Sequence, residues 1–171
     1  MAAIYRAEVI GSILRPGGLK QARTDFAADR ISTAQFKRVE DRAVDEAIAL
    51  QERCGVDIVS DGEMRRSDFV APLTDYVEGF EAVAFDTRRW RGGGVSASGD
   101  TGETSLAVPL TVTGKLRRRR SLAAEEFIYA RARAKLPLKA TLPSPLMLAM
   151  RWSPEHSAAA YPVRSGCSLT P

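Results

Sequence analysis

Two carboxylates and two arginines follow a short apolar run near residue 60 of this chain. Residues 56–60 are rich in β-branched side chains, which is typical of a buried strand. The run leads directly into Asp61-Gly62-Glu63, with Arg65 and Arg66 behind it. Carboxylates in this position lie at the carboxyl end of a strand, where α/β folds bind their ligands, and Gly62 permits a sharp bend. The pattern predicts a ligand-binding position at this strand end.

A purely structural interpretation of the same residues stays open. In it, Asp61 caps the start of a helix and Arg66 forms an ion pair on the surface.

A second strand end offers hydrogen-bond donors. Residues 5–10 are predicted to form the first strand, which ends in Gly11-Ser12. The backbone N–H groups and the Ser12 hydroxyl could bind a carboxylate or an amine of a ligand. The alternative is an ordinary exit from a strand into a loop.

The elements between these strand ends follow from capping and periodicity. Residues 13–18 form a loop because Pro16 and two glycines interrupt regular structure, and residues 19–28 a short helix. Ser32 and Gln35 fit a capping box that opens a helix running to about residue 53, which Gly55 ends. Its apolar positions are Phe36, Val39, Ala43, Ala47 and Leu50. The order strand–helix–strand predicts a parallel pair with a right-handed crossover.

The second half of the chain is less regular. Residues 76–85 and 106–113 are predicted to form an inserted β-hairpin whose glycine-rich tip is mobile. Gly92-Gly93-Gly94 in that tip is not a P-loop, because no Gly-Lys-Ser/Thr follows. We expect a helix over 122–135 with Ser121 as its N-cap, a strand over 138–142 and a short apolar helix towards Met150.

Composition narrows the class of protein. The chain has 171 residues, 44% hydrophobic and 27% charged, as expected for one soluble globular domain. No apolar run is long enough to span a bilayer, and the first residues lack the layout of a signal peptide, so a cytoplasmic protein without membrane contact is expected. The two cysteines and one histidine are too few for a Cys/His zinc site or a disulfide framework, and Cys54 is expected to be a small buried residue.

The net charge of +4 also has a simple interpretation. Much of it comes from the four arginines 117–120, which we expect in a solvated loop before a helix. Without interleaved aromatic residues or a nucleic-acid-binding motif, we expect no nucleic-acid partner.

Three segments, in this order, resemble the catalytic barrel of cobalamin-independent methionine synthase. They are residues 8–16 with Ile10-Gly11-Ser12 and Leu14-Arg15-Pro16, residues 51–68 with Asp61-Gly62-Glu63, and Leu142-Pro143-Ser144-Pro145 before an apolar helix. The resemblance spans roughly residues 6–162. It implies an α/β fold, namely part of a (β/α)8 TIM barrel with an inserted β-hairpin, over residues 1–162, followed by an aperiodic tail over 163–171.

The resemblance also implies an activity and a site. The family transfers a methyl group from methyltetrahydrofolate polyglutamate to the thiolate of homocysteine, which a zinc ion activates. Ile10, Gly11 and Ser12 match the segment that holds the amino-acid end of homocysteine, and Glu63 matches the acidic residue that binds its ammonium group. Trp152 lies near the pterin-stacking aromatic residue of the family. Asp61 stands where a histidine is usual, as in shorter relatives.

A complete barrel needs about 250 residues, so this chain supplies about four of the eight β-α units. The zinc ligands of the family lie in the second half, and His156 and Cys167 do not match their pattern, so we expect this chain to bind no zinc. We expect a truncated or frame-shifted methyltransferase domain that is inactive alone.

The alternatives are a non-catalytic half-barrel that is active only with a partner chain, or a related enzyme that alkylates another thiol such as coenzyme M. Open sheet edges would favour association between chains.

Overall fold

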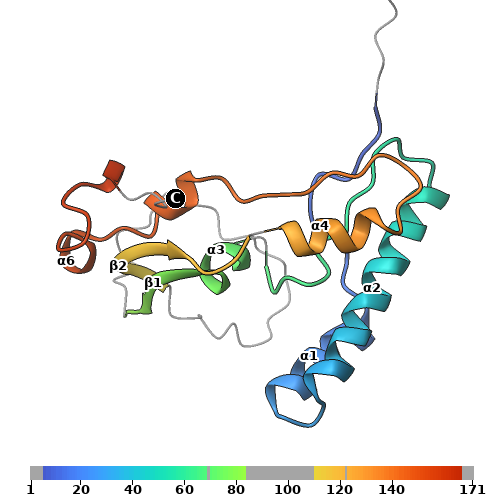
Figure 1. Ribbon diagram of the computed structural model, residues 1–171, viewed down its shortest axis with the longest axis horizontal. Helices are drawn as coiled ribbons and strands as arrows, with labels where there is room; N and C mark the ends of the chain where they lie inside the picture. Colours follow the sequence, from blue (N-terminus) through green and yellow to red (C-terminus); the bar gives the residue numbers. More distant parts are fainter. Residues whose placement is uncertain (1–5, 69, 84–109, 122, 167–171) are drawn as a thin grey trace, which may run out of the picture. The chain divides into compact units, whose positions relative to one another are not determined.

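The computed structural model describes residues 6–68, 70–83, 110–121 and 123–166 (Figure 1). The chain forms two compact units. The first consists of Met1–Tyr76 and Arg120–Pro143, and the second of Val77–Arg119 and Ser144–Pro171.

The longest element of the first unit is the helix α2 (Thr33–Arg53). It begins with the predicted capping box: Gln35 N donates to Ser32 Oγ at 3.2 Å, and Ser32 N donates to Gln35 Oε1 at 2.7 Å. Gly55, at φ +74°, follows the end of the helix, where a left-handed residue is favourable. Capping box, length and stop are therefore confirmed.

Helix α1 (Gly17–Ala27) folds back along α2, and α4 (Ala124–Arg131) also contacts α2 (Figure 1). A further short helix, α3 (Ala71–Asp75), belongs to this unit. Ser121 Oγ accepts from Ala124 N at 3.3 Å, but α4 is shorter than the predicted helix over 122–135, and Leu122 lies outside the described residues. The core comprises Leu19, Ala43, Val44, Ala47, Ile48, Val59, Met64, Ala130 and Ala134.

Two predictions at the end of α2 are wrong. Leu50 is 43% exposed, whereas the neighbouring Gln51 is buried because its amide has hydrogen-bond partners below the helix. Cys54 is exposed, because it lies at the C-cap of α2, beyond the residues that pack into the core.

Three extended segments of the first unit pair in parallel. Glu8 bridges Ile58 and Val59 bridges Leu138, so residues 56–60 lie between the other two segments. The parallel direction of the predicted pair is confirmed, but each pairing is a single bridge and not a full strand. Beside the first bridge, Ala7 N donates to the Asp57 carboxylate at 2.8 Å and not to a backbone carbonyl.

The second unit contains the predicted hairpin. Strands β1 (Val77–Ala82) and β2 (Leu110–Arg118) pair antiparallel, with an irregularity between Glu78 and Phe80. They form the two-stranded sheet of the described part of the chain. The expected mobile tip, with Gly92-Gly93-Gly94, lies outside the described residues.

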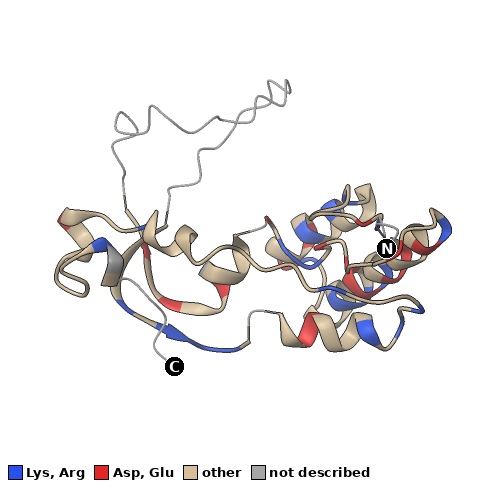
Figure 2. Ribbon diagram, turned by 90° about the horizontal axis from the view of Figure 1, so that it is seen from above, with Lys and Arg blue, Asp and Glu red and all other residues tan. Residues whose placement is uncertain are grey.

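Arg117 and Arg118 lie in β2, opposite Glu78 and Val77, and not in a loop as predicted. Their side chains remain exposed, and Arg119 forms an ion pair with Glu78 at 3.0 Å. Both Lys or Arg and Asp or Glu occur along the helices of the first unit (Figure 2).

Short helices complete the second unit. The predicted apolar helix is confirmed as α5 (Leu146–Ala149), and α6 (Pro154–Ser157) packs against β2. Part of the predicted tail forms the 3-10 turn η2 (Arg164–Gly166), and Cys167 lies outside the described residues. Leu116 N donates to the Tyr161 hydroxyl at 2.8 Å, which connects this C-terminal stretch to β2.

In the described ranges, no helix combines the length and the apolar character needed to cross a membrane.

We predict that Gly79→Ala destabilises the hairpin by about 1–3 kcal/mol. Gly79 has φ +99°, and a Cβ there would lie 2.8 Å from the backbone oxygen of Lys115. Urea denaturation measures the change in the free energy of unfolding. The matched control is Gly114→Ala in the facing strand, where the nearest atom to a new Cβ is at 3.7 Å and little change is expected. Equal effects of the two substitutions would contradict the prediction.

Candidate functional site

The side chain of Gln51 fixes the end of the central extended segment. Its Nε2 donates to Ser60 O at 2.8 Å and to Ala47 O at 2.9 Å, and its Oε1 accepts from Ser60 N at 3.0 Å. Gln51 and Ser60 are both buried. The amide therefore satisfies both backbone groups of Ser60, as a neighbouring strand would do.

The backbone turns sharply after Ser60. Gly62 and Glu63 both adopt positive φ, at +67° and +56°. Glu63 N donates to Asp61 Oδ1 at 3.0 Å, and Gly62 N donates to Ser60 Oγ at 3.2 Å. A left-handed conformation is uncommon for a residue with a Cβ and persists where the surroundings enforce it, often at functional sites. Asp61 thus holds a tight turn and does not begin a helix.

Arg15 and Arg23, which precede the turn in the sequence, donate hydrogen bonds to its backbone carbonyl groups. Arg15 donates to Glu63 O at 3.2 Å and to Arg66 O at 3.1 Å. Arg23, on α1, donates to Met64 O at 3.1 Å and to Arg66 O at 2.8 Å. The turn therefore keeps its shape through charge-assisted hydrogen bonds.

The result is that three segment ends meet at the carboxylate of Glu63. Ser12 Oγ donates to Glu63 Oε2, and Thr141 Oγ1 donates to Glu63 Oε1 at 2.8 Å. Gly11 lies beside them, since a Cβ there would be 3.8 Å from Glu63 Oε1. Glu63 is only 4% exposed, whereas Ser12 is exposed and marks the open side of the group. The structure thus brings Gly11, Ser12 and Glu63 together, and the exposed Ile10 immediately precedes them.

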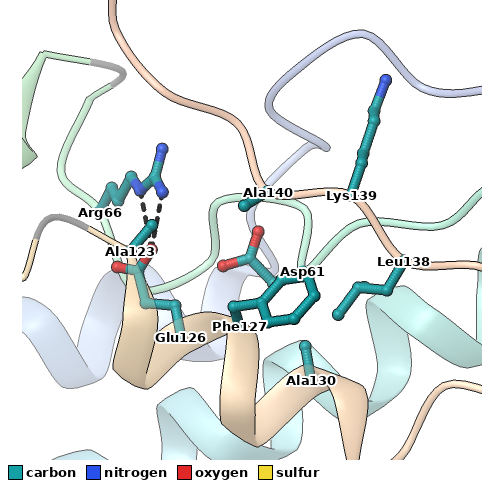
Figure 3. Close-up of a pocket in the computed structure, with 9 residues that line it drawn as sticks. All are labelled: Asp61, Arg66, Ala123, Glu126, Phe127, Ala130, Leu138, Lys139 and Ala140. Carbon is teal, nitrogen blue, oxygen red and sulfur yellow. Dashed lines mark hydrogen bonds and ion pairs between the residues drawn. The ribbon is translucent and has the colours of Figure 1, made fainter.

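Arg66, which lies near Glu63, forms a buried ion pair with Glu126 (Figure 3). Arg66 donates to Glu126 Oε2 through Nη2 at 2.7 Å and through Nε at 3.1 Å. Its Nη1 donates to Thr141 Oγ1 at 3.2 Å and lies 3.7 Å from Glu63 Oε1. Arg66 is buried, so the interpretation that it pairs on the surface is wrong.

The pKa values of both members of this pair are shifted from their usual ranges. Burial raises the pKa of the Glu126 carboxyl above its usual range, although the hydrogen bonds and charge of Arg66 act in the opposite direction. Burial lowers the pKa of Arg66, but hydrogen bonding and attraction by Glu126, with smaller contributions from Asp61 and Glu63, raise it overall. Arg66 therefore remains charged beside Glu63.

Thr141 and Glu126 are parts of this site that the sequence reasoning missed. Thr141 lies in the predicted strand over 138–142, and its position opposite Asp61-Gly62-Glu63 in a parallel arrangement was the available signal. Nothing in the local pattern marked Glu126, because helical surfaces commonly carry glutamates.

Two predictions remain, the pterin-stacking Trp152 and the absence of a metal site. Trp152, the residue expected near a pterin, belongs to the second unit, where its Nε1 donates to Tyr161 O at 2.9 Å. Within the ranges that the structure describes, no group of three or more His, Cys, Asp or Glu side chains could hold a metal ion. His156 and Cys54 are both exposed and belong to different units. The described residues thus do not fit a zinc ion.

Chemically, the arrangement around Glu63 can bind a small ligand with two charged ends. An ionised carboxylate accepts several hydrogen bonds, so Glu63 has capacity beyond Ser12 and Thr141 for a cationic group. The Ser12 hydroxyl and the backbone around Gly11 provide donors for an anionic group nearby.

Comparison with known proteins identifies the family to which the chain is similar. The family model for the catalytic domain of cobalamin-independent synthase matches residues 6–156. The uncharacterized protein YxjH of Bacillus subtilis is 31% identical over 153 residues, which cover 85% of this chain and 37% of that protein. A 5-methyltetrahydropteroyltriglutamate–homocysteine methyltransferase of Syntrophotalea carbinolica is 31% identical over 144 residues, covering 84% of this chain and 17% of that enzyme.

A solved structure shares the fold. The B12-independent methionine synthase of Shewanella sp. W3-18-1, determined in complex with selenomethionine, superposes with a TM-score of 0.64 at 20% identity. The match covers 95% of this chain and 43% of that one. The chain therefore spans less than half the length of these relatives.

We predict that Gln51→Leu destabilises the first unit by about 2–5 kcal/mol, because it leaves the buried N–H and C=O of Ser60 without partners. Urea denaturation measures the loss. Gln21→Leu, at an exposed position of α1, is the control and should change stability little. A Gln51→Leu variant as stable as the wild type would show that Ser60 finds other partners.

A second prediction concerns pH. Above the ordinary glutamate pKa of about 4.3, the raised pKa of Glu126 means that the folded chain binds more protons than the unfolded chain. The contribution of Glu126 to the free energy of unfolding therefore falls as pH rises from about 4.3 through the raised pKa. The wild type should lose stability relative to Glu126→Gln over this range, as measured by urea denaturation at several pH values.

The control for this titration is Glu125→Gln, because the Glu125 side chain is exposed. The stability difference between wild type and this control should not change with pH. A wild type that gains stability relative to Glu126→Gln as pH rises would contradict the prediction and would mean that the attraction of Arg66 outweighs burial.

Proposed function

The chain belongs to the family of cobalamin-independent synthase catalytic domains, and we propose that it forms the N-terminal half of a methionine-synthase-like (β/α)8 barrel. Its activity in the complete domain is methyl transfer from a methyltetrahydrofolate to the thiol of homocysteine, as in 5-methyltetrahydropteroyltriglutamate–homocysteine methyltransferases. Residues 163–171 follow this half-barrel as a tail.

The observation that carries the proposal is the meeting of Ser12, Thr141 and Glu63 at the ends of three parallel-paired segments. In a parallel α/β arrangement, such ends form the ligand-binding edge. We assign the ammonium group of homocysteine to Glu63, and its carboxylate to the backbone N–H groups and hydroxyl of Ile10-Gly11-Ser12. Because Ser12 contacts Glu63, one α-amino acid can reach both.

The remaining parts of the reaction belong to residues outside the described site. Zinc activates the thiol in this family, and the described residues hold no group of ligands that fits it. We place the zinc ligands in the half of the barrel that this chain does not supply. Trp152 is our candidate for stacking on the pterin.

A second candidate function is a half-barrel that acts only with another chain. Large apolar side chains of the first unit are exposed: Ile10 at 89%, Leu14 at 88% and Leu142 at 63%. They flank the segments that end at Glu63, where further barrel strands would cover them. A related enzyme that alkylates a different thiol, such as coenzyme M, would use the same half-barrel.

We predict that the wild-type chain binds homocysteine and that Glu63→Gln weakens binding about 10- to 100-fold. This loss corresponds to a charge-assisted hydrogen bond of about 1.5–3 kcal/mol. Isothermal titration calorimetry measures both dissociation constants. The control, Glu125→Gln on the exposed face of α4, should leave binding unchanged. An unchanged affinity in Glu63→Gln would remove Glu63 from the site.

Zinc content and complementation together test the division of the site between two halves. Both candidates expect the purified chain to carry no stoichiometric zinc; the methionine-synthase proposal is supported if adding the second half of the barrel restores methylation of homocysteine, and the alternative thiol alkyltransferase is supported if it restores alkylation of another thiol only. A chain that binds one zinc and is active alone would contradict the division of the site between two halves.

A further inference from the structure

An open pocket lies between helix α1 and the end of the turn that carries Glu63. Its volume is about 470 Å³, which is within the range of pockets that bind small molecules. Of the described residues, those that line it include three basic side chains, Arg15, Lys20 and Arg23, and no carboxylate. Ser67, whose hydroxyl forms no hydrogen bond in the described part of the chain, lines the pocket as well. The pocket therefore combines positive charge with hydrogen-bond donors.

The basic side chains of this pocket are held close to one another. Arg15 Nε and Arg23 Nη1 both donate to the carbonyl oxygen of Arg66, at 3.1 and 2.8 Å, so the two guanidiniums meet at one oxygen atom. Lys20 and Arg23 are three positions apart on α1 and therefore lie on the same face of the helix. Ser67 directly follows Arg66 in the chain. An anion in the pocket is thus surrounded by side chains from α1, from the loop before it and from the end of the turn.

The two arginines have donors and charge left for a ligand. A guanidinium has five N–H donors, and Arg15 and Arg23 each form two hydrogen bonds to backbone carbonyls of the turn. Those carbonyl groups are neutral. Within the described ranges, neither arginine forms an ion pair with a carboxylate, so the positive charge of both is available to an anion.

The electrostatics of Arg23 point in the same direction. Burial lowers the pKa of Arg23, and this effect outweighs the attraction of Glu40 and Asp75, while Arg15 lowers the pKa further. Glu40 also lies 3.9 Å from Arg65, with which it forms an ion pair. The charge of Arg23 is therefore only partly compensated within the described part of the chain. A bound anion would stabilise it.

We propose that this pocket binds the phosphate group of a small organic phosphate. Arg15 and Arg23 donate to its oxygens, Lys20 adds a third positive charge, and the Ser67 hydroxyl donates a further hydrogen bond. A phosphate monoester has three strong acceptor oxygens and a charge near −2, so it satisfies more of these donors than a carboxylate does. The apolar part of the pocket wall, which faces the carbon skeleton of the ligand, comes from Leu19 and Ala27.

This site goes beyond the proposed function, because phosphate is neither a reactant nor a product of the proposed methyl transfer. The side chains assigned to homocysteine, Ser12 and Glu63, do not line the pocket. The two sites share the turn, since Arg15 donates to Glu63 O at 3.2 Å while its side chain lines the pocket. They can therefore be tested independently.

The test is isothermal titration calorimetry of the full chain with inorganic phosphate and with glycerol 3-phosphate, at a fixed ionic strength set by sodium chloride. We expect saturable binding of both at one site per chain, with the ester bound at least as tightly as inorganic phosphate. Succinate, a dianion of the same charge with carboxylates in place of phosphate, is the ligand control and should bind more weakly. The absence of saturable phosphate binding would overturn the site. Succinate bound as tightly as phosphate would overturn its assignment to phosphate.

Variants locate the binding. Arg23→Gln should weaken phosphate binding about 10- to 100-fold, as expected for the loss of a charge-assisted hydrogen bond. Lys20→Gln, at an exposed position, should weaken it about two- to fivefold and decides the test if Arg23→Gln does not fold. The control Arg38→Gln changes the net charge equally at an exposed position of α2 and should leave the affinity unchanged.

The same loss in Arg38→Gln as in the pocket variants, or full affinity in the pocket variants, would refute the assignment. Calorimetry with homocysteine and Glu63→Gln tests the proposed function separately, because it depends on Glu63 and not on the basic pocket.

Discussion

The hydrogen bonds between the Gln51 amide and the backbone of Ser60 are the constraint on which the candidate site depends. They end the parallel pairing of the central segment and connect it to the core through α2. From that fixed point the chain enters two consecutive left-handed residues, Gly62 and Glu63. The carboxylate of Glu63 therefore lies at the end of the segment. There it accepts hydrogen bonds from the hydroxyls of Ser12 and Thr141, which belong to the two neighbouring segments.

Charge is concentrated behind this turn to an unusual degree for a buried region. Arg66 connects Glu63, Thr141 and Glu126, while Arg15 and Arg23 occupy the carbonyls of the turn. Charged groups are costly to bury unless they are paired and hydrogen-bonded, as Arg66 is here with Glu126 and Thr141. The geometry of Glu63 is thus maintained by electrostatics as much as by apolar packing.

Much of this arrangement could be predicted from the sequence, because it follows from local signals. The capping box at Ser32 and the stop at Gly55 defined α2, and the motif around Glu63 marked the turn. What escaped prediction depends on partners distant in the chain. Gln51 is buried in place of Leu50 because its amide forms hydrogen bonds with the backbone of Ser60. Glu126 pairs with Arg66 although the two residues are 60 positions apart in the sequence. The parallel pairing is limited to single bridges, and Ala7 N bonds the Asp57 side chain beside one of them, which strand periodicity does not encode.

The first unit is built from two stretches of chain that enclose residues 77–119 as an insertion. The entropy of closing such a loop grows only with the logarithm of its length, by about 0.6 kcal/mol for each doubling. Evolution can therefore lengthen, shorten or exchange the inserted hairpin at little thermodynamic expense to the segments that converge on Glu63. Homologous chains are expected to diverge in size mainly at this insertion while the scaffold of the first unit stays recognisable.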